Sequence, residues 1–354
     1  MFSFRTTPIE DQLDKALRDG RVGVFSTQNS WDVAHGRYLS DVFRERGNLA
    51  VVFESRETEL TPGIHHIVFE AERLEGLSAV VVEIQDVGSR YFNHTRDVFR
   101  LMSVLSGMEE PPALYIVDHV NPAGRAVEGT IPVMDTEPWT PCVAHRHGLT
   151  LGELCALYHH EIGARYGLHV ISALANPSSK LLLPWTIAPA SDIPGMFTCL
   201  MYSGGALWQH TTLTPGIGTP RPYEYIGAPF LVASDIPTLP APEGVLLRPC
   251  TFTPAQGRYA GERCTGFHII LTPGAEYHSF LHTVLLMRSL RGRYSQFEFE
   301  DGFFRELCDP VVEAYLREEI TFDVVQEHVK TEEQKWIRKA RRFLLYDDAP
   351  YRMK

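Results

Sequence analysis

The chain has 354 residues, of which 44% are hydrophobic and 22% charged, and its formal net charge at pH 7 is −11. A chain of this length predicts two domains or one large one, and the composition is that of an ordinary globular protein. The negative charge, without any Lys/Arg run, argues against nucleic acid or an anionic membrane as a partner. No apolar stretch approaches the ~20 residues of a membrane span.

The cysteines and the first residues predict a cytoplasmic protein. Six cysteines lie far apart, with no Cys-x-x-Cys pair, and such spacing favours reduced thiols in a core. The start of the chain lacks a basic stretch followed by an apolar one, so no signal peptide is expected.

Four short apolar runs in the first third predict strands of a buried parallel sheet. They cover residues 22–25, 49–53, 79–82 and 113–117. Continuous Val/Ile/Leu runs suit strands that helices cover on both faces. Helical spacing over residues 9–19, 37–46 and 93–105 alternates with these runs, and a capping box from Thr150 to Glu153 opens a further helix. This order predicts an α/β fold with a Rossmann-like, doubly wound, mostly parallel sheet.

The second half of the sequence is less regular. Residues 184–229 are rich in Pro, Gly and Thr and predict a system of binding loops. Residues 237–242 resemble a linker, so we expect a larger domain over residues 1–236 and a smaller α/β domain over residues 237–354. The elements expected in the smaller domain are strands at 245–248 and 266–271 and helices at 277–290, 310–317 and 331–343.

Polar residues follow the predicted strands where each run ends. In parallel sheets the ligand binds beyond the carboxyl ends of the strands. We therefore expect a cleft lined by Thr27, Glu83, Asp86, Asp118 and His147. Structural alternatives are an ion pair between Asp86 and Arg90 and a loop-anchoring role for Asp118.

Arg146 and His147 precede the capped helix. Helix N-termini attract anions, and Arg146 adds positive charge, so this loop predicts binding of an acidic group. A solvated loop is the alternative. Three acids, Glu54, Glu57 and Glu59, follow the second strand; one of them is a candidate general acid, and a solvated turn is again the alternative.

Other motifs are weak or missing. The pairs His65-His66 and His159-His160 lack the i, i+4 spacing of a helical zinc site. The Gly-rich stretches at 203–205 and 216–218 lack the context of a phosphate-binding loop, and no Gly-x-Ser-x-Gly elbow of a serine hydrolase occurs. The residues thus predict chemistry carried by carboxylates, without a metal or nucleotide.

Several blocks in order resemble one family. Residues 83–92 resemble Asp-Ile-Gln-Asp-Val-Gly-x-Arg followed by two aromatics, and residues 118–124 resemble Asp-Arg-Pro-Asn-Pro-x-Gly, with Val127-Glu128-Gly129 after them. Residues 146–154 match Arg-His-Gly-x-Thr-x-Gly-Glu-Leu almost completely. Further blocks lie at 221–224, 227–230 and 343–346. Together they resemble the bacterial exo-β-N-acetylmuramidases over nearly the whole chain.

The resemblance implies a Rossmann-like larger domain, a smaller α/β domain and a cleft between them. It also implies release of N-acetylmuramic acid from the non-reducing end of peptidoglycan fragments, with no cofactor. The catalytic Glu of the family lies in a Pro-Glu-His-Gly loop. Here the loop reads Glu54-Ser55-Arg56-Glu57, and a shift of one residue assigns the role to Glu57.

Other blocks also depart from the family. Ser-Pro-Asn-Met-Pro becomes Ala190-Ser191-Asp192-Ile193-Pro194, Glu-Gly-Thr-Asn becomes residues 209–212, and Gly-Arg-Gly becomes residues 216–218. Such changes leave a fold intact more readily than an activity.

We therefore predict a cytoplasmic glycoside hydrolase that acts on a small amino-sugar or muropeptide substrate. Its catalytic residues would be Glu57, with Glu54 as the alternative, and Asp86 or Asp118. The residues expected to contact substrate are Thr27, Glu83, Arg90, Asn121, Glu128, Arg146, His147, Asp192, Arg221 and Glu224. A catalytically silent sugar-binding or regulatory homologue is the alternative.

Overall fold

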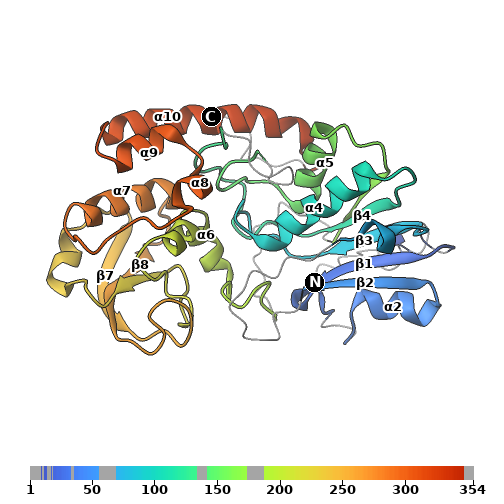
Figure 1. Ribbon diagram of the computed structural model, residues 1–354, viewed down its shortest axis with the longest axis horizontal. Coiled ribbons are helices and arrows are strands. Elements are labelled where there is room, and N and C mark those ends of the chain that lie inside the picture. Colours follow the sequence, from blue (N-terminus) through green and yellow to red (C-terminus); the bar gives the residue numbers. More distant parts are fainter. Residues whose placement is uncertain are drawn as a thin grey trace.

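A parallel five-stranded sheet forms the larger lobe of the computed structural model (Figure 1), which describes residues 9, 12–13, 17, 19–32, 36–55, 69–133, 142–173 and 187–346, without the side chains of residues 54 and 55. The strands are β1 (Val22–Thr27), β2 (Leu49–Ser55), β3 (Ala79–Glu83), β4 (Ala113–Asp118) and β5 (Leu168–Ser172). Their order is β2-β1-β3-β4-β5 and every pair is parallel. The predicted doubly wound sheet is thus confirmed, and its order reverses between β1 and β3.

Helices cover both faces because successive strand residues point to opposite sides. In β3, Val80 and Val82 belong to one buried cluster, whereas Ala79 and Val81 belong to another. The helices of this lobe are α2 (Leu39–Arg46), α3 (Ala71–Leu74), α4 (Asn93–Gly107) and α5 (Leu151–Glu161). The predicted capping box is present, since Thr150 N donates to Glu153 Oε2 at 2.9 Å and Glu153 N donates to Thr150 Oγ1 at 3.3 Å.

The smaller lobe contains a three-stranded antiparallel sheet in the order β6-β8-β7. Its strands are β6 (Tyr225–Ala228), β7 (Val245–Phe252) and β8 (Cys264–Leu271). Its helices are α6 (Met196–Gly205), α7 (Ser279–Arg291), α8 (Phe303–Leu307) and α9 (Pro310–Leu316), with 3₁₀ turns η2 (Ala206–His210) and η3 (Ala233–Thr238). The segment expected to be binding loops thus contains α6 and β6.

The expected domain boundary at 236/237 falls inside the smaller lobe. Strand β6 precedes this position, yet it pairs with β8, which follows it. The Pro-rich segment therefore connects two strands of one sheet rather than two domains. We propose that the chain divides between β5 and α6.

The last helix, α10 (Phe322–Ala340), belongs to both lobes. Figure 1 shows it along the top of the molecule, extending from α9 toward α5. Val325 and Val329 are buried in the core of the smaller lobe, whereas Trp336 and Ala340 are buried in the core of the larger one. Trp336 Nε1 also donates to the carbonyl of His147 at 2.8 Å. The C-terminal half of α10 thus helps to hold the loop that precedes α5.

Helix α6 packs against α7 so closely that a side chain does not fit at Gly204. A Cβ there would lie 2.2 Å from the carbonyl oxygen of Ser279. We expect Gly204→Ala to lower the free energy of unfolding by about 3 kcal/mol, the upper range for overpacking, because the obstacle is backbone. Chemical denaturation would measure the change.

The matched control is Gly107→Ala at the end of α4, where a Cβ meets nothing within 4 Å. This variant should be unchanged or more stable by up to ~1 kcal/mol. Equal stability of the two variants would contradict the close packing of α6 on α7.

Candidate active site

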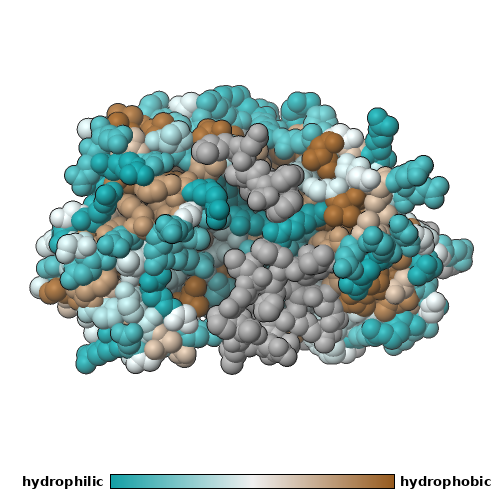
Figure 2. Space-filling view, in the orientation of Figure 1, coloured by the Kyte–Doolittle hydropathy of each residue, from teal (hydrophilic) through white to brown (hydrophobic). Residues whose placement is uncertain are grey.

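The carboxyl edge of the large sheet carries the predicted polar residues. Thr27 ends β1, Glu83 ends β3 and Asp118 ends β4. Thr27 and Asp118 are buried, whereas Glu83 is half-buried. Figure 2 shows hydrophilic side chains at the middle of one face of the molecule, where the two lobes meet.

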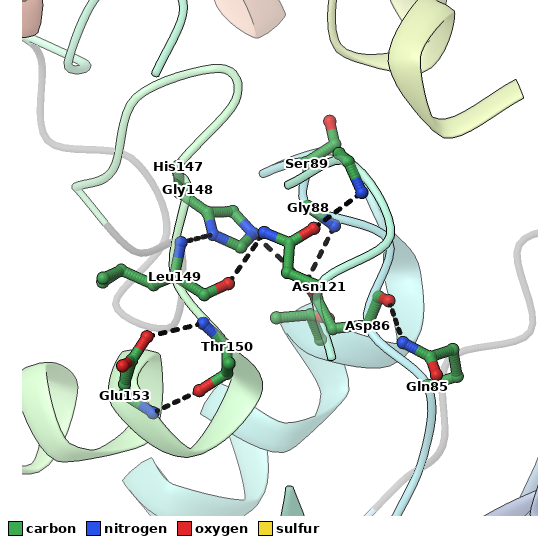
Figure 3. A network of polar contacts seen from close by, with 12 residues as sticks. Gln85, Asp86, Gly88, Ser89, Asn121, His147, Gly148, Leu149, Thr150 and Glu153 are labelled. Atoms are coloured by element: carbon green, nitrogen blue, oxygen red, sulfur yellow. Dashed lines mark hydrogen bonds and ion pairs between the residues drawn. The ribbon is translucent and has the colours of Figure 1, made fainter. Parts of the chain in front are cut away.

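Asp86 and His147 are brought together, as expected. His147 Nε2 lies 3.4 Å from Asp86 Oδ2, and Figure 3 shows the loop after β3 facing the loop before α5. Asp86 also accepts hydrogen bonds from Gly88 N at 2.8 Å and Thr95 Oγ1 at 2.7 Å. Burial by itself raises the pKa of Asp86, but His147 and the two hydrogen bonds outweigh it and hold the pKa below its usual value.

Asp118 anchors the start of α5. Its Oδ1 accepts from Gly152 N, and its Oδ2 accepts from Thr150 Oγ1 and Tyr346 Oη, each at 2.8 Å. Burial raises the pKa of Asp118 to about 6, although the three hydrogen bonds oppose that shift. This geometry is that of a carboxylate that anchors a loop, the alternative role considered for Asp118. The amount by which Asp118 stabilises the fold depends on whether its carboxyl group is protonated.

Arg90 does not pair with Asp86 in any contact that the structure describes; it binds backbone carbonyls instead. Its guanidinium donates to Thr130 O at 3.0 Å, Glu306 O at 3.1 Å and Leu307 O at 2.8 Å. The last two carbonyls belong to the C-terminal end of α8, where a cation stabilises the helix dipole. Arg90 therefore joins the loop after β3 to the smaller lobe, and its donors face protein atoms.

Arg146 is paired with Glu128 rather than open to a ligand. Arg146 Nη1 donates to Glu128 Oε1 at 2.6 Å, and both side chains are buried. Glu128 Oε2 accepts from Ser279 Oγ at 2.6 Å and from Phe280 N at 3.2 Å. Burial would raise the pKa of Glu128, but Arg146, His278 and Ser279 outweigh it and lower the pKa. Glu128 thus accepts hydrogen bonds from Arg146 in the larger lobe and from Ser279 and Phe280 in the smaller lobe.

Asn121 also makes hydrogen bonds to backbone groups of the protein. Its Nδ2 donates to Leu149 O and its Oδ1 accepts from Ala123 N, each at 2.9 Å. At Gly88, where φ is +83°, a Cβ would lie 2.5 Å from Asn121 Oδ1. The Gly in this turn is therefore required both by the backbone conformation and by the approach of Asn121.

The remaining residues expected to contact substrate lie on the smaller lobe; they are Asp192, Arg221 and Glu224. Asp192 accepts from Tyr223 Oη at 2.5 Å, and Gln209 Nε2 donates to the same hydroxyl at 2.9 Å. Arg221 Nη1 donates to Glu224 Oε2 at 3.1 Å. No contact among the described residues joins Arg221 or Glu224 to Asp86, so their expected contact with substrate stays a prediction.

Glu57 lies outside the described residues, and Glu54 is described only by its backbone in β2. The register of the sheet places Ser55 opposite Thr27. The chain therefore leaves β2 for the Glu57 segment at the edge that carries the other polar residues.

Sequence reasoning missed two groups. Ser279 and Tyr346 hold Glu128 and Asp118 from segments 151 and 228 residues away in the chain, a separation at which no local pattern signals contact. Asp32 and Tyr38 line a small pocket with Glu83 at the ends of β1 and β3. In the part of the chain that the structure describes, no cluster of three or more metal-ligating side chains occurs, and no helix is long and apolar enough to cross a membrane.

Comparisons with known proteins find the same family in both lobes. Residues 66–186 match the family model "Exo-beta-N-acetylmuramidase NamZ, N-terminal", and residues 200–346 match its C-terminal counterpart. Peptidoglycan beta-N-acetylmuramidase NamZ of Bacillus subtilis (strain 168) is 26% identical over 253 residues, which are 67% of this chain. The match spans 59% of that relative's own length.

Solved structures show the same fold. Two DUF1343 family proteins from Bacteroides fragilis NCTC 9343 superpose with TM-scores of 0.79 and 0.72, at 16% and 19% sequence identity. The alignments cover 96% of this chain in both cases, and 97% and 98% of the two neighbours.

The buried ion pair predicts a large effect on stability when Arg146 is removed. We expect Arg146→Met to lower the free energy of unfolding by about 3–5 kcal/mol, because Glu128 is left as an uncompensated buried charge. Arg221→Met is the matched control; the Arg221 side chain is 52% exposed, so its loss should cost less than about 1 kcal/mol. Similar losses in both variants would show that Arg146 has no special structural role.

The raised pKa of Asp118 predicts a pH dependence of stability. The folded protein holds the proton up to about pH 6, whereas an unfolded Asp ionises near 3.9. Stability should therefore fall as pH rises from about 4 to about 6, by roughly 2–3 kcal/mol in total, and then level off. Denaturation curves of the wild type minus those of Asp118→Asn isolate this contribution; parallel pH profiles would contradict it.

Proposed function

The chain belongs to the exo-β-N-acetylmuramidase NamZ family, and we propose that it is an exo-acting glycoside hydrolase that releases N-acetylmuramic acid, or a closely related amino sugar, from the non-reducing end of peptidoglycan fragments. The observation that carries the proposal is the match of both family halves, in order, over residues 66–186 and 200–346. The function printed for the Bacillus subtilis relative agrees with it.

The polar edge of the sheet supports the same chemistry. Glycosidases use two carboxyl groups beside the scissile bond, one of which donates a proton to the leaving oxygen. The carboxylates at this edge come from the ends of different strands, and the ends of parallel strands meet at the usual binding edge of such sheets.

We assign the proton donor to Glu57, with Glu54 as the alternative. Both residues are in the segment where β2 ends, and Ser55 lies opposite Thr27 in the sheet. Both carboxylate oxygens of Asp86 and of Asp118 accept hydrogen bonds from the protein, so we propose that these residues position loops, through His147 and α5 respectively, rather than contact the sugar.

A cytoplasmic role in recycling cell-wall fragments fits this proposal. The buried thiols of Cys155, Cys199, Cys264 and Cys308 are not in disulfides, as is usual for proteins of a reducing compartment. Muropeptides brought into the cell would then be the substrates.

The proposal is tested with a β-1,4-linked N-acetylmuramyl-N-acetylglucosamine disaccharide. The wild-type protein should release both monosaccharides, and Glu57→Gln should lower kcat by roughly 10²–10⁴-fold with little change in KM, because an amide cannot donate the proton. Chromatography of the products measures turnover.

Glu59→Gln is the matched control in the same segment and should retain activity. Loss of turnover in Glu54→Gln alone would move the role of proton donor to Glu54. A wild-type protein that binds the disaccharide without cleaving it would refute the hydrolase proposal.

A further inference from the structure

A cavity of about 430 Å³ lies where α5 and α10 end, beside the 3₁₀ turn η4 (Arg341–Phe343). We call it the α5–α10 pocket; its lining residues are His160, Glu161, Lys339, Arg342 and Phe343. Figure 1 shows α5 beside the C-terminal end of α10. Helix α5 has 11 residues, so the pocket lies about 15 Å from the end of α5 that meets the polar edge of the sheet. Its volume is within the ~300–1,000 Å³ of small-molecule sites.

The charged side chains of the pocket carry an excess of positive charge. Lys339 and Arg342 are cations, and Glu161 is the one carboxylate among the lining residues that the structure describes. Glu161 makes an ion pair with Lys339, and Lys339 Nζ also donates to the carbonyl of Cys142 at 3.4 Å. An ammonium group has three donors, so Lys339 keeps one for a ligand. The charge of Glu161 is thus compensated, and that of Arg342 is left over.

The guanidinium of Arg342 indicates an anionic ligand. Arg342 is exposed, and in the part of the chain that the structure describes no group hydrogen-bonds or pairs with its side chain. Cations near helix C-termini stabilise the helix dipole, and both α5 and α10 end here, so positive charge alone does not identify a binding site. The cavity that Arg342 lines is the second observation, because it has room for a molecule beside open donors.

The lining favours a phosphate group with an organic part attached. A phosphate monoester has a charge of about −1.5 to −2 at pH 7 and three acceptor oxygens. The lining offers three donor groups on three residues, the guanidinium of Arg342, the ammonium of Lys339 and the imidazole of His160. The remaining wall is aromatic, since the rings of His160 and Phe343 lie 5.5 Å apart between centroids. Phe343 also packs against the core of the larger lobe, so its ring is a fixed surface for an organic group.

The pocket is connected to the loop before α5 from both sides. Residues 339–343 lie between two hydrogen bonds to that region. On one side, Trp336 Nε1 donates to the carbonyl of His147 at 2.8 Å. On the other side, Tyr346 Oη donates at 2.8 Å to Asp118, which anchors the start of α5. A ligand that holds α5 and η4 together therefore restrains the elements that support this loop.

We propose that the α5–α10 pocket binds a small phosphorylated molecule, with the phosphate held by Arg342, Lys339 and His160, and that the bound molecule stabilises the loop before α5. The pocket is then a regulatory site, separate from the polar edge of the sheet. This inference does not depend on the proposed glycosidase function, because it rests on the cavity, its charges and the contacts of α10.

The test compares the binding of phenyl phosphate, inorganic phosphate and benzoate by titration calorimetry. The wild type should bind phenyl phosphate about threefold or more tightly than either other probe, because only phenyl phosphate combines the phosphate with a ring that contacts Phe343. Arg342→Gln should weaken the binding of phenyl phosphate about tenfold or more, as for the loss of a hydrogen bond between charged groups. Phe343→Leu should remove the preference for phenyl phosphate over inorganic phosphate.

Arg341→Gln is the matched control. It removes the same charge from the neighbouring residue, which is exposed and is not among the lining residues. Its binding of phenyl phosphate should weaken less than about threefold, because exposed charges interact weakly. Thermal unfolding without ligand identifies any variant that fails to fold. Lys339→Gln then replaces Arg342→Gln, with the same tenfold loss expected.

Hydrogen exchange of the backbone amides at residues 146–154 tests the effect on the loop. Saturating phenyl phosphate should slow this exchange in the wild type, but not in Arg342→Gln at the same ligand concentration. Unchanged exchange in the wild type overturns the regulatory role.

Other outcomes overturn the site or its ligand. Absence of binding of phenyl phosphate to the wild type overturns the site, as do equal losses in Arg342→Gln and Arg341→Gln. Tighter binding of benzoate overturns the assignment to a phosphate. Equal binding of inorganic phosphate and phenyl phosphate to the wild type overturns the assignment to an organic phosphate and identifies the free ion as the ligand.

Discussion

The buried carboxylate of Glu128 joins the two lobes, and the loops at the edge of the large sheet depend on it. One oxygen accepts from Arg146 at 2.6 Å, and the other accepts from Ser279 at 2.6 Å and from Phe280 N at 3.2 Å, at the start of α7. A buried charge is costly unless its partners are all present. The Arg146 loop and α7 must therefore be in place together for the charge of Glu128 to be compensated.

This constraint reaches the edge of the sheet through the backbone. Glu128 N donates to Arg146 O and Arg146 N donates to Glu128 O, each at 3.0 Å, so the ion pair also fixes the main chain of its own loop. His147 follows directly and lies beside Asp86. Trp336 holds the carbonyl of His147 from α10. The Glu128–Arg146 ion pair and helix α10, which is buried in both cores, thus position the loop before α5 opposite the loop after β3.

Sequence patterns predicted the large sheet well because its signals are local. Continuous apolar runs and a Thr-to-Glu capping box depend on neighbouring residues, and the structure confirms both. Helix α6 was missed because most of its residues are buried, which leaves no polar face to reveal a helical period. The Pro-rich segment at 237–242 signals a turn but not which strands it connects, and in the structure it joins β6 to β7, which both pair with β8. The charge of Arg146 was visible in the sequence, but its partner Glu128 also accepts from Ser279 and Phe280, more than 130 residues beyond Arg146.

The distribution of hydrogen bonds identifies the residues that hold the fold. Asp118 and Arg146 have protein partners on the atoms that a ligand would need, and both carboxylate oxygens of Glu128 accept hydrogen bonds from the protein. The blocks that most resemble the family therefore include much of the framework, whose loss would destabilise both lobes. Changes outside such a framework leave a fold intact more readily than an activity, and we propose that the activity of this chain depends on Glu57, with Glu54 as the alternative.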